Sequence, residues 1–143
     1  MTVKAILDAK GREVVTVSAD KTLGEAVSLL AARGIGAVVV TTDDGRISGI
    51  LSERDVVRVI GNEGPGVLEK PVSAIMTARV RVCQESHTVN EVMQIMTEGR
   101  FRHLPVEEQG RLVGIVSIGD VVKRRIEEAE REAEEIRSYI ATA

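Results

Sequence analysis

Residues 49–55 of the chain read GILSERD, and residues 114–120, 65 positions later, read GIVSIGD. In both stretches an apolar run ends at a serine, and the apolar residues that follow have helical spacing. Ser52 and Ser117 are therefore predicted to be the N-caps of helices. Asp55 and Asp120 stand three residues later, close to the spacing of a capping box, in which the acidic side chain bonds back to the cap N–H.

The same residue types also suit a nucleotide. A helix N-terminus offers unpaired N–H groups and the positive end of a dipole, which favour a phosphate. An ionised carboxylate can accept hydrogen bonds from both vicinal hydroxyls of a ribose. A hydroxyl and an aspartate three residues apart are thus expected to hold the phosphate side and the ribose side of one nucleotide. Capping alone is the alternative interpretation.

Repetition extends well beyond these two motifs. Residues 14–40 align with residues 80–106 at a constant offset of 66, which falls to 65 after one residue is lost in the following turn. A duplication explains this pattern most simply. The first repeat is predicted at residues 1–62 and the second at 71–126. Between them lies a Gly- and Pro-containing linker at 63–70, and a C-terminal helical extension follows at 127–143.

Each repeat is predicted to fold in the order β-α-β-β-α, which makes the chain an α+β protein. A Thr-x-x-Glu capping box opens the first helix of each repeat, and a Gly-containing turn joins the two strands after it. The residues that carry these signals are Thr22 with Glu25, Thr88 with Glu91, Asp44-Gly45 and Gln109-Gly110. The predicted strands are 14–17, 37–40 and 46–51, then 80–83, 103–106 and 111–116, and segments 3–7 and 72–76 are matching lead-ins.

Composition narrows the possible functions. The chain of 143 residues has a net charge of −3 and 1% aromatic residues, so neither a clustered basic surface nor a stacking platform for nucleic acid is expected. No run approaches the ~20 apolar residues of a membrane span, and the N-terminal residues lack the apolar core of a signal peptide. The single cysteine excludes an internal disulfide. We therefore expect a soluble cytoplasmic protein that binds neither nucleic acid nor membrane.

Two tandem β-α-β-β-α repeats, each ending on Gly-apolar-x-Ser-x-x-Asp, resemble a stand-alone pair of cystathionine β-synthase (CBS) domains, often called a Bateman module. The resemblance covers about residues 1–126. It implies that the repeats pack through their sheets around a pseudo-twofold axis. It also implies two clefts for an adenosine ligand (AMP, ADP, ATP or NAD/NADH), with no metal required. Ser52 and Ser117 would then face phosphate, and Asp55 and Asp120 would hold ribose hydroxyls.

Basic residues near the motifs differ between the repeats. The first repeat has Arg54 where the second has Gly119, and Gly36 where the second has Arg102. These two places often carry phosphate-facing basic side chains in the family, so Arg54 and Arg102 are the predicted phosphate ligands, with His103 as a weaker candidate. The alternative is that both arginines are solvated surface residues.

The remaining candidates for the clefts lie at or near predicted strands. They are Gly36 and Ala37, at the start of one strand, and Thr16, Val17, Val82 and Cys83, whose backbone groups would contact the base. For Cys83 the alternative is a small, buried apolar role in the core.

The C-terminal region carries a heptad pattern. Apolar residues recur at intervals of four and three, which predicts one helix from about residue 118 to 140 with a seam along one face. The seam consists of Val122, Ile126, Ala129, Ala133, Ile136 and Ile140. We expect this helix to pack on its own module or on a second copy of the chain, with a solvated charged helix as the alternative.

The favoured function is a regulatory sensor of adenine nucleotides, a homodimer whose occupancy alters an unknown protein target. An oxidoreductase of the inosine monophosphate dehydrogenase type would need a barrel of about 250 residues and a reactive cysteine, for which this sequence has no room. No Ser-His-Asp set and no metal-ligand cluster stands out, so no catalytic residue is predicted. A structural dimerisation module with empty clefts is the remaining alternative.

Overall fold

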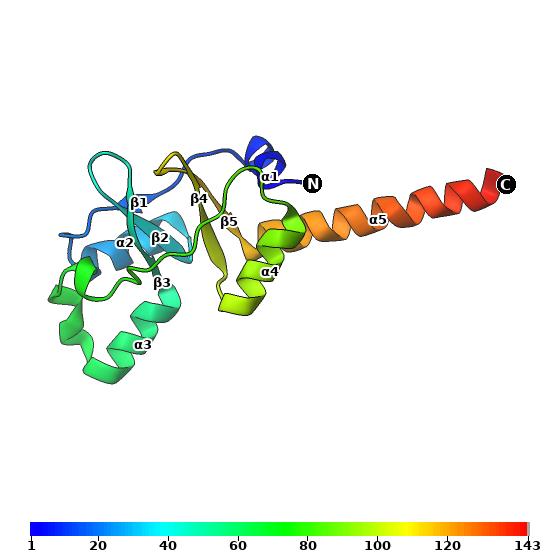
Figure 1. The fold of residues 1–143 in the computed structure, drawn as a ribbon. Coiled ribbons are helices and arrows are strands. Elements are labelled where there is room, and N and C mark those ends of the chain that lie inside the picture. Colours follow the sequence, from blue (N-terminus) through cyan, green and yellow to red (C-terminus); the bar gives the residue numbers. More distant parts are fainter. Residues whose placement is uncertain (143) are drawn as a thin grey trace.

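In the computed structural model, which describes residues 1–142, two repeats lie side by side and a long helix extends away from them (Figure 1). The first repeat contains β1 (Thr16–Val17), α2 (Leu23–Arg33), β2 (Ala37–Thr41), β3 (Ile47–Ser52) and α3 (Glu53–Glu63). Its sheet has the order β1-β2-β3, with β1 parallel and β3 antiparallel to β2. The predicted β-α-β-β-α order is confirmed here, although β1 is shorter than the predicted strand 14–17.

The second repeat contains α4 (Val89–Gly99), β4 (His103–Glu108), β5 (Arg111–Ser117) and α5 (Ile118–Thr142). The predicted strand at 80–83 is wrong, because only an isolated parallel bridge joins Cys83 to Val106. The next rung toward residue 81 would need an N–H from residue 105, and Pro105 has none. The first repeat has Val39 in the equivalent position, and β1 pairs there.

Both predicted Thr-x-x-Glu motifs cap helices. Thr88 Oγ1 accepts from the Glu91 N–H at 3.1 Å, and the Glu91 carboxylate accepts from the Thr88 N–H at 3.2 Å, which completes a capping box on α4. On α2, Thr22 Oγ1 accepts from the Glu25 N–H at 3.1 Å. The Glu25 carboxylate there lies 3.8 Å from Nζ of Lys21, so this motif makes the threonine half of the box.

The N-terminal lead-in packs on the second repeat. It forms α1 (Val3–Lys10), and a backbone bridge between Thr2 and Thr88 fixes its start. Its three large apolar side chains are buried in the hydrophobic cluster of the second repeat, which is made of aliphatic residues with one methionine and one cysteine. The buried residues of α1 are Val3, Ile6 and Leu7.

The second lead-in makes the reciprocal contact. Residues 72–76 begin with the 3-10 helix η2 (Val72–Ala74), and Val72 is buried in the hydrophobic cluster of the first repeat. The Val72 N–H donates to the Lys21 carbonyl at 2.7 Å. The preceding residues, predicted as a linker, hold a second 3-10 helix, η1 (Pro65–Glu69), whose Val67 is also buried. The two repeats thus exchange their first segments, which ties them into one unit.

This exchange explains the glycine that opens each motif. A Cβ added to Gly114 would lie 2.7 Å from Cδ1 of Leu7, which comes from α1. A Cβ added to Gly49 would lie 2.5 Å from the sulfur of Met76, in the other exchanged segment. Both distances are below any normal contact, so the exchanged segments can approach the strands only where the side chain is a single hydrogen.

The two sheets meet near their hairpin turns. The Leu112 N–H donates to the Gly45 carbonyl at 3.1 Å, and Nη1 of Arg111 donates to the Asp44 carbonyl at 2.7 Å. These bonds join β5 to the β2–β3 turn. The expected packing of the repeats through their sheets is therefore confirmed.

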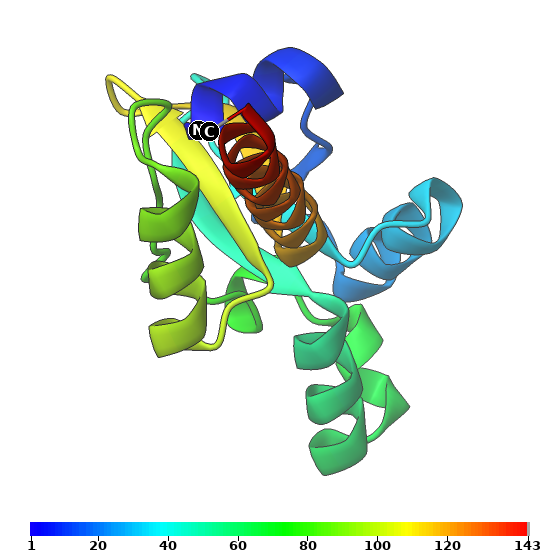
Figure 2. The same ribbon diagram turned by 90° about the vertical axis from the view of Figure 1, so that its right-hand side faces the viewer.

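The predicted C-terminal helix is confirmed as α5. It leaves the body beyond its first turns, and Figure 2, which looks nearly along its axis, shows α1 beside its base. An ion pair of 3.2 Å joins the Met1 amino group to Glu128 at this base. The apolar side chains of Ile136 and Ile140 are 61% and 68% exposed, so the outer seam does not pack on its own module. Ala143, the last residue of the predicted extension, lies outside the described residues, and no helix within residues 1–142 meets the length and apolarity of a membrane span.

Candidate functional site

Both Ser-x-x-Asp motifs form capping boxes. At the start of α3 the Ser52 N–H donates to Oδ2 of Asp55 at 3.1 Å, and the Asp55 N–H donates to Ser52 Oγ at 3.3 Å. At the start of α5 the Ser117 N–H donates to Oδ2 of Asp120 at 2.9 Å, and the Asp120 N–H donates to Ser117 Oγ at 3.2 Å. The predicted capping role of Ser52 and Ser117 is confirmed at both motifs. The capping bonds fix the position of each hydroxyl and carboxylate, and the oxygen lone pairs that capping does not use are left for a ligand.

The first motif lines a cavity of about 400 Å³ between the two repeats. Seven of the predicted residues meet there, and they come from both halves of the chain. They are Gly36, Ala37, Ser52, Arg54, Asp55, Arg102 and His103.

Backbone pairing brings these distant segments together. Ala37, at the start of β2, pairs with Ser52 at the end of β3, and the Glu53 N–H donates to the Gly36 carbonyl at 2.9 Å. In the second repeat the Ile118 N–H donates in the same way to the Arg102 carbonyl at 2.8 Å. Each motif is therefore bound to the start of the first hairpin strand in its own repeat.

One backbone donor at this helix start is free. Of the first three N–H groups of α3, that of Glu53 is bonded to Gly36 and that of Asp55 to Ser52. Within residues 1–142 the Arg54 N–H has no acceptor. An unpaired N–H at a helix N-terminus is a donor to which an anion can bind.

The cavity is rich in cations. Four arginines line it, against two carboxylates, those of Glu53 and Asp55. Oδ1 of Asp55 accepts from Nη2 of Arg58 at 2.7 Å, but the Arg58 side chain is 69% exposed and, among the described residues, pairs only with its own helix. The arginines are Arg54, Arg58, Arg100 and Arg102.

Charged groups near both motifs act on the pKa of His103. Burial lowers the pKa of His103 below the usual histidine value. The carboxylates of Glu53 and Asp120 oppose this shift, whereas the cations of Lys10 and Arg102 add to it. The net direction is downward, so the imidazole is neutral at neutral pH and is available as a donor and an acceptor.

The second motif differs in its partners. Nζ of Lys10, in the last turn of α1, donates to Oδ2 of Asp120 at 2.7 Å and to the Ile115 carbonyl at 3.0 Å. Burial raises the pKa of Asp120, but the bonds from Lys10 and the Ser117 N–H outweigh it and hold that pKa below the usual value. Asp120 is therefore ionised and already paired with a cation.

Six predicted residues lie outside the lining of the first cavity: Ser117, Asp120, Thr16, Val17, Val82 and Cys83. Cys83 is fully buried in the cluster of the second repeat. Its N–H donates to the Pro105 carbonyl at 3.0 Å, and its carbonyl accepts from the Glu107 N–H at 2.9 Å. Because both backbone groups are used within the fold, the core role describes Cys83 better than contact with a base.

The cavity is also lined by residues that no sequence motif predicts. They are Ile50, Glu53, Arg58, Thr77, Gly99, Arg100 and Phe101. Arg58 stands three residues after Asp55, a spacing that places acidic and basic groups together on a helix and gave a usable signal. Phe101 directly precedes Arg102, so the segment that supplies one predicted phosphate ligand also supplies the aromatic wall.

No cluster of three or more His, Cys, Asp and Glu side chains within residues 1–142 has the arrangement needed to hold a metal ion.

Comparison with known proteins identifies the family. Residues 3–62 and 72–127 each match the CBS domain. A mitochondrial CBS domain-containing protein of Arabidopsis thaliana, CBSX3, is 31% identical over 148 residues, which cover 97% of this chain and 71% of that protein. A longer protein of the same plant, CBSCBSPB1, is 31% identical over 129 residues, and this chain spans 24% of its length.

Solved structures agree with the family match. A CBS-domain containing protein from Agrobacterium tumefaciens has a TM-score of 0.84 and 54% identity, covering 87% of this chain and 99% of that chain. A CBS domain protein from Pyrobaculum aerophilum, solved in complex with AMP, has a TM-score of 0.74 and 27% identity, covering 84% and 89%. With two family matches in tandem and the fold that they predict, the chain belongs to the CBS-domain family as a pair of CBS domains.

Proposed function

We propose that the chain is a regulatory module that binds a phosphorylated adenosine ligand in the cavity at Ser52 and Asp55 and signals its occupancy to a protein target. The ligand class comprises AMP, ADP, ATP and NAD/NADH. The observation that carries the proposal is the convergence of a free helix N–H, several arginines and a capping carboxylate in one cavity between the repeats.

The phosphate end would lie at the start of α3. The Arg54 N–H is free there within residues 1–142, and its guanidinium lines the same cavity. Arg102 approaches from the other repeat, so two planar guanidinium groups converge on one region. Guanidinium groups bind phosphate through paired hydrogen bonds, and the helix dipole adds to the attraction.

The ribose end would lie at Asp55. Its Oδ2 is used in the capping box, whereas Oδ1 is bonded to Arg58, whose side chain is exposed and free to turn toward solvent. Arg58 is the exposed partner of this pair, with its side chain 69% exposed against 16% for Asp55, so its guanidinium can return to water when a ribose hydroxyl replaces it. The freed oxygen would then accept from a ribose hydroxyl.

Similarity to a known complex supports the ligand class. The Pyrobaculum aerophilum protein, with the same fold and 27% identity, was solved with AMP. A cavity of about 400 Å³ falls in the size range of about 300–1,000 Å³ that is usual for small-molecule sites.

The proposed role is binding and regulation, without catalysis. Burial, and secondarily the charge of Glu108, raises the pKa of Cys83 to about 12. The Cys83 thiol therefore stays protonated at neutral pH and does not act as a nucleophile.

The proposed assembly is a homodimer whose interface includes α5. Its seam residues Val122, Ile126, Ile136 and Ile140 are 41% to 68% exposed, which favours burial against a second copy. The same exposure favours the alternative function, a structural dimerisation module whose clefts stay empty. Absorbance at 260 nm separates the two, because a chain with no Trp and one Tyr makes a co-purified adenine conspicuous.

Calorimetric titration tests the proposal. The purified protein, freed of any co-purified ligand, is titrated with AMP, ADP, ATP, NAD, NADH and S-adenosylmethionine. Saturable binding of at least one phosphorylated ligand is expected. Binding of S-adenosylmethionine alone would contradict the phosphate end of the site, and no binding to any of the six would contradict the function.

A further inference from the structure

The contact between Lys10 and Asp120 has no counterpart at the first motif. The exchanged segments align Leu7 with Met76, since these side chains cover Gly114 and Gly49 in the same way. In that alignment Arg79 is the equivalent of Lys10. Arg79 forms no ion pair within residues 1–142, and Asp55 pairs instead with Arg58 of its own helix.

Lys10 is held more firmly than Arg58. Its Nζ bonds two acceptors of the second repeat, Oδ2 of Asp120 and the Ile115 carbonyl, and its side chain is 35% exposed. The Arg58 side chain is 69% exposed and bonds one carboxylate three residues away. A charged hydrogen bond is stronger than one from a neutral hydroxyl, so a ribose would compete poorly with Lys10 for Asp120.

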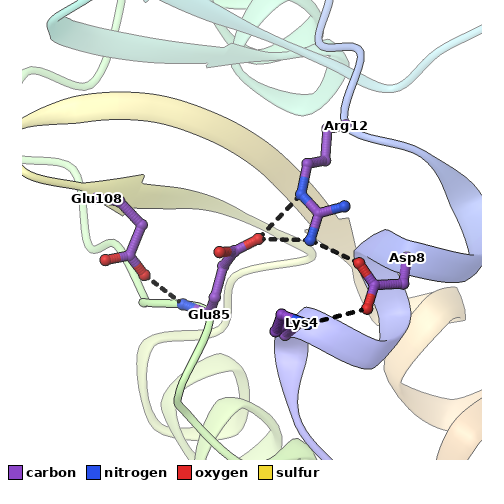
Figure 3. Close-up of polar contacts among 5 residues, drawn as sticks. All are labelled: Lys4, Asp8, Arg12, Glu85 and Glu108. Atoms are coloured by element: carbon purple, nitrogen blue, oxygen red, sulfur yellow. Dashed lines mark hydrogen bonds and ion pairs between the residues drawn. The ribbon is translucent and has the colours of Figure 1, made fainter.

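The helix that carries Lys10 is itself anchored on the second repeat. Figure 3 shows that Arg12, just beyond α1, donates from Nε and Nη2 to Oε1 of Glu85 at 3.0 and 2.8 Å. Nη2 of the same arginine lies 2.7 Å from Oδ1 of Asp8 on α1, and Lys4 lies 3.4 Å from the other oxygen. The Glu85 N–H in turn donates to Glu108 at 2.8 Å. With its apolar side buried, α1 keeps Lys10 in place.

The second motif lacks the arginine that follows Ser52 in the first. Gly119 stands where the first motif has Arg54, and the side chain of Arg102, whose carbonyl accepts from the Ile118 N–H of the second motif, lines the first cavity. Lys10 is thus the cation bonded to this motif, and it neutralises the carboxylate on which a nucleotide would depend.

We propose that Lys10 is an autoinhibitory lock on the second Ser-x-x-Asp motif, so that the chain binds one nucleotide at Asp55 and none at Asp120 while α1 is docked. This inference rests on the proposed function of the first cavity. It predicts that removal of the Lys10 ammonium group opens a second binding event, and that displacement of α1 by a partner would do the same.

The test is calorimetric stoichiometry with AMP on Lys10→Met, which keeps most of the apolar stem and removes the charge. The matched control is Lys4→Met, on the same helix, where Nζ pairs with Asp8 and with no other carboxylate of residues 1–142. We expect one AMP per chain for the wild type and Lys4→Met, two for Lys10→Met, and one again for Lys10→Met combined with Asp120→Asn. Thermal unfolding confirms that each variant is folded, and Lys10→Gln replaces Lys10→Met if the latter is not.

The outcomes distinguish failure of the Lys10 lock from failure of the function proposed for the first cavity. Two AMP per wild-type chain, or one per Lys10→Met chain, would overturn the lock and leave the proposed function standing. Binding by Lys10→Met in the absence of wild-type binding would support the lock and contradict the assignment of the first cavity. No binding by any variant would overturn both.

Discussion

Gly36 of the first repeat and His103 of the second lie next to each other in the lining of the cavity, and a Cβ added to Gly36 would lie 3.3 Å from Cε1 of His103. The two residues lie at the starts of equivalent strands in the repeats, since β2 starts next to Gly36 and β4 starts at His103. A ligand in this cavity would touch both repeats at once. Occupancy could therefore change how the repeats sit against each other, which is the kind of signal that a partner can detect.

Enlarging Gly36 should close the cavity. Gly36→Leu would push against His103 and Glu53, and we expect AMP affinity to fall at least tenfold, about 1.4 kcal/mol. Gly61→Leu is the control, because nothing lies within 4 Å of a Cβ at that position on α3. Calorimetry on both variants measures the difference. Equal affinities for Gly36→Leu and the wild type would place the ligand elsewhere.

The two arginines at the phosphate end should contribute separately. Arg54→Ala or Arg102→Ala is expected to weaken AMP binding by about 1.5 to 3 kcal/mol, the usual value of a hydrogen bond to a charged group. Adenosine, which has no phosphate, should lose much less. Arg131→Ala on the exposed part of α5 serves as the control. If both variants bind AMP and adenosine as the wild type does, these arginines are ordinary surface residues.

Removal of the outer part of α5 should loosen self-association without harm to the cavity. A chain truncated after Glu128 keeps the Met1 ion pair and the buried Val121 but loses the exposed seam at Ile136 and Ile140. Sedimentation should show a larger dissociation constant for the dimer, while AMP binding stays unchanged. A truncated chain that dimerises as tightly as the full chain would assign the seam to another partner.

Acidification should destabilise the fold through His103. Its pKa in the folded state lies below the usual 6.5, so the unfolded chain binds the proton first as the pH falls. The stability linked to the neutral ring is thus complete above pH 6.5 and is lost as the pH falls from there through the folded-state pKa. His103→Asn should flatten the dependence of the unfolding free energy on pH in this window. An identical slope in wild type and variant, from urea unfolding at several pH values, would contradict this assignment.

The main elements could be predicted because the duplication supplied each signal twice. The Ser-x-x-Asp motifs, the Thr-x-x-Glu boxes and the hairpin turns depend on local backbone chemistry, which a sequence displays directly. The missing strand at 80–83 shows the limit of such reasoning. Residues 80–83 are of the types that favour a strand. The segment that would pair with them carries Pro105, which has no N–H to donate, and this is apparent only once the register of the two segments is known.

The first cavity could be predicted in outline and not in full. Ser52, Arg54 and Asp55 belong to one motif, and Arg102 was found by comparing the two repeats. Phe101 belongs to no motif, and its position in the cavity depends on how the repeats pack. Lys10 likewise lies 110 positions before Asp120, and only the exchange of the lead-in segments brings it there.

The assignment of the first cavity depends most on Asp55, where capping and binding make different predictions. Asp55→Asn keeps an acceptor for the cap, so the unfolding free energy should fall by about 1 kcal/mol or less. If Asp55 binds the ribose, the substitution removes a charged hydrogen bond. AMP binding should then weaken by about 1.5 to 3 kcal/mol, roughly ten- to a hundredfold. Asp43→Asn, on the exposed turn after β2, is the control. Calorimetric titration of AMP into Asp55→Asn is therefore the decisive measurement. A loss of ten- to a hundredfold with the fold intact is the predicted result, and wild-type affinity in a slightly destabilised variant would contradict the binding of ribose by Asp55.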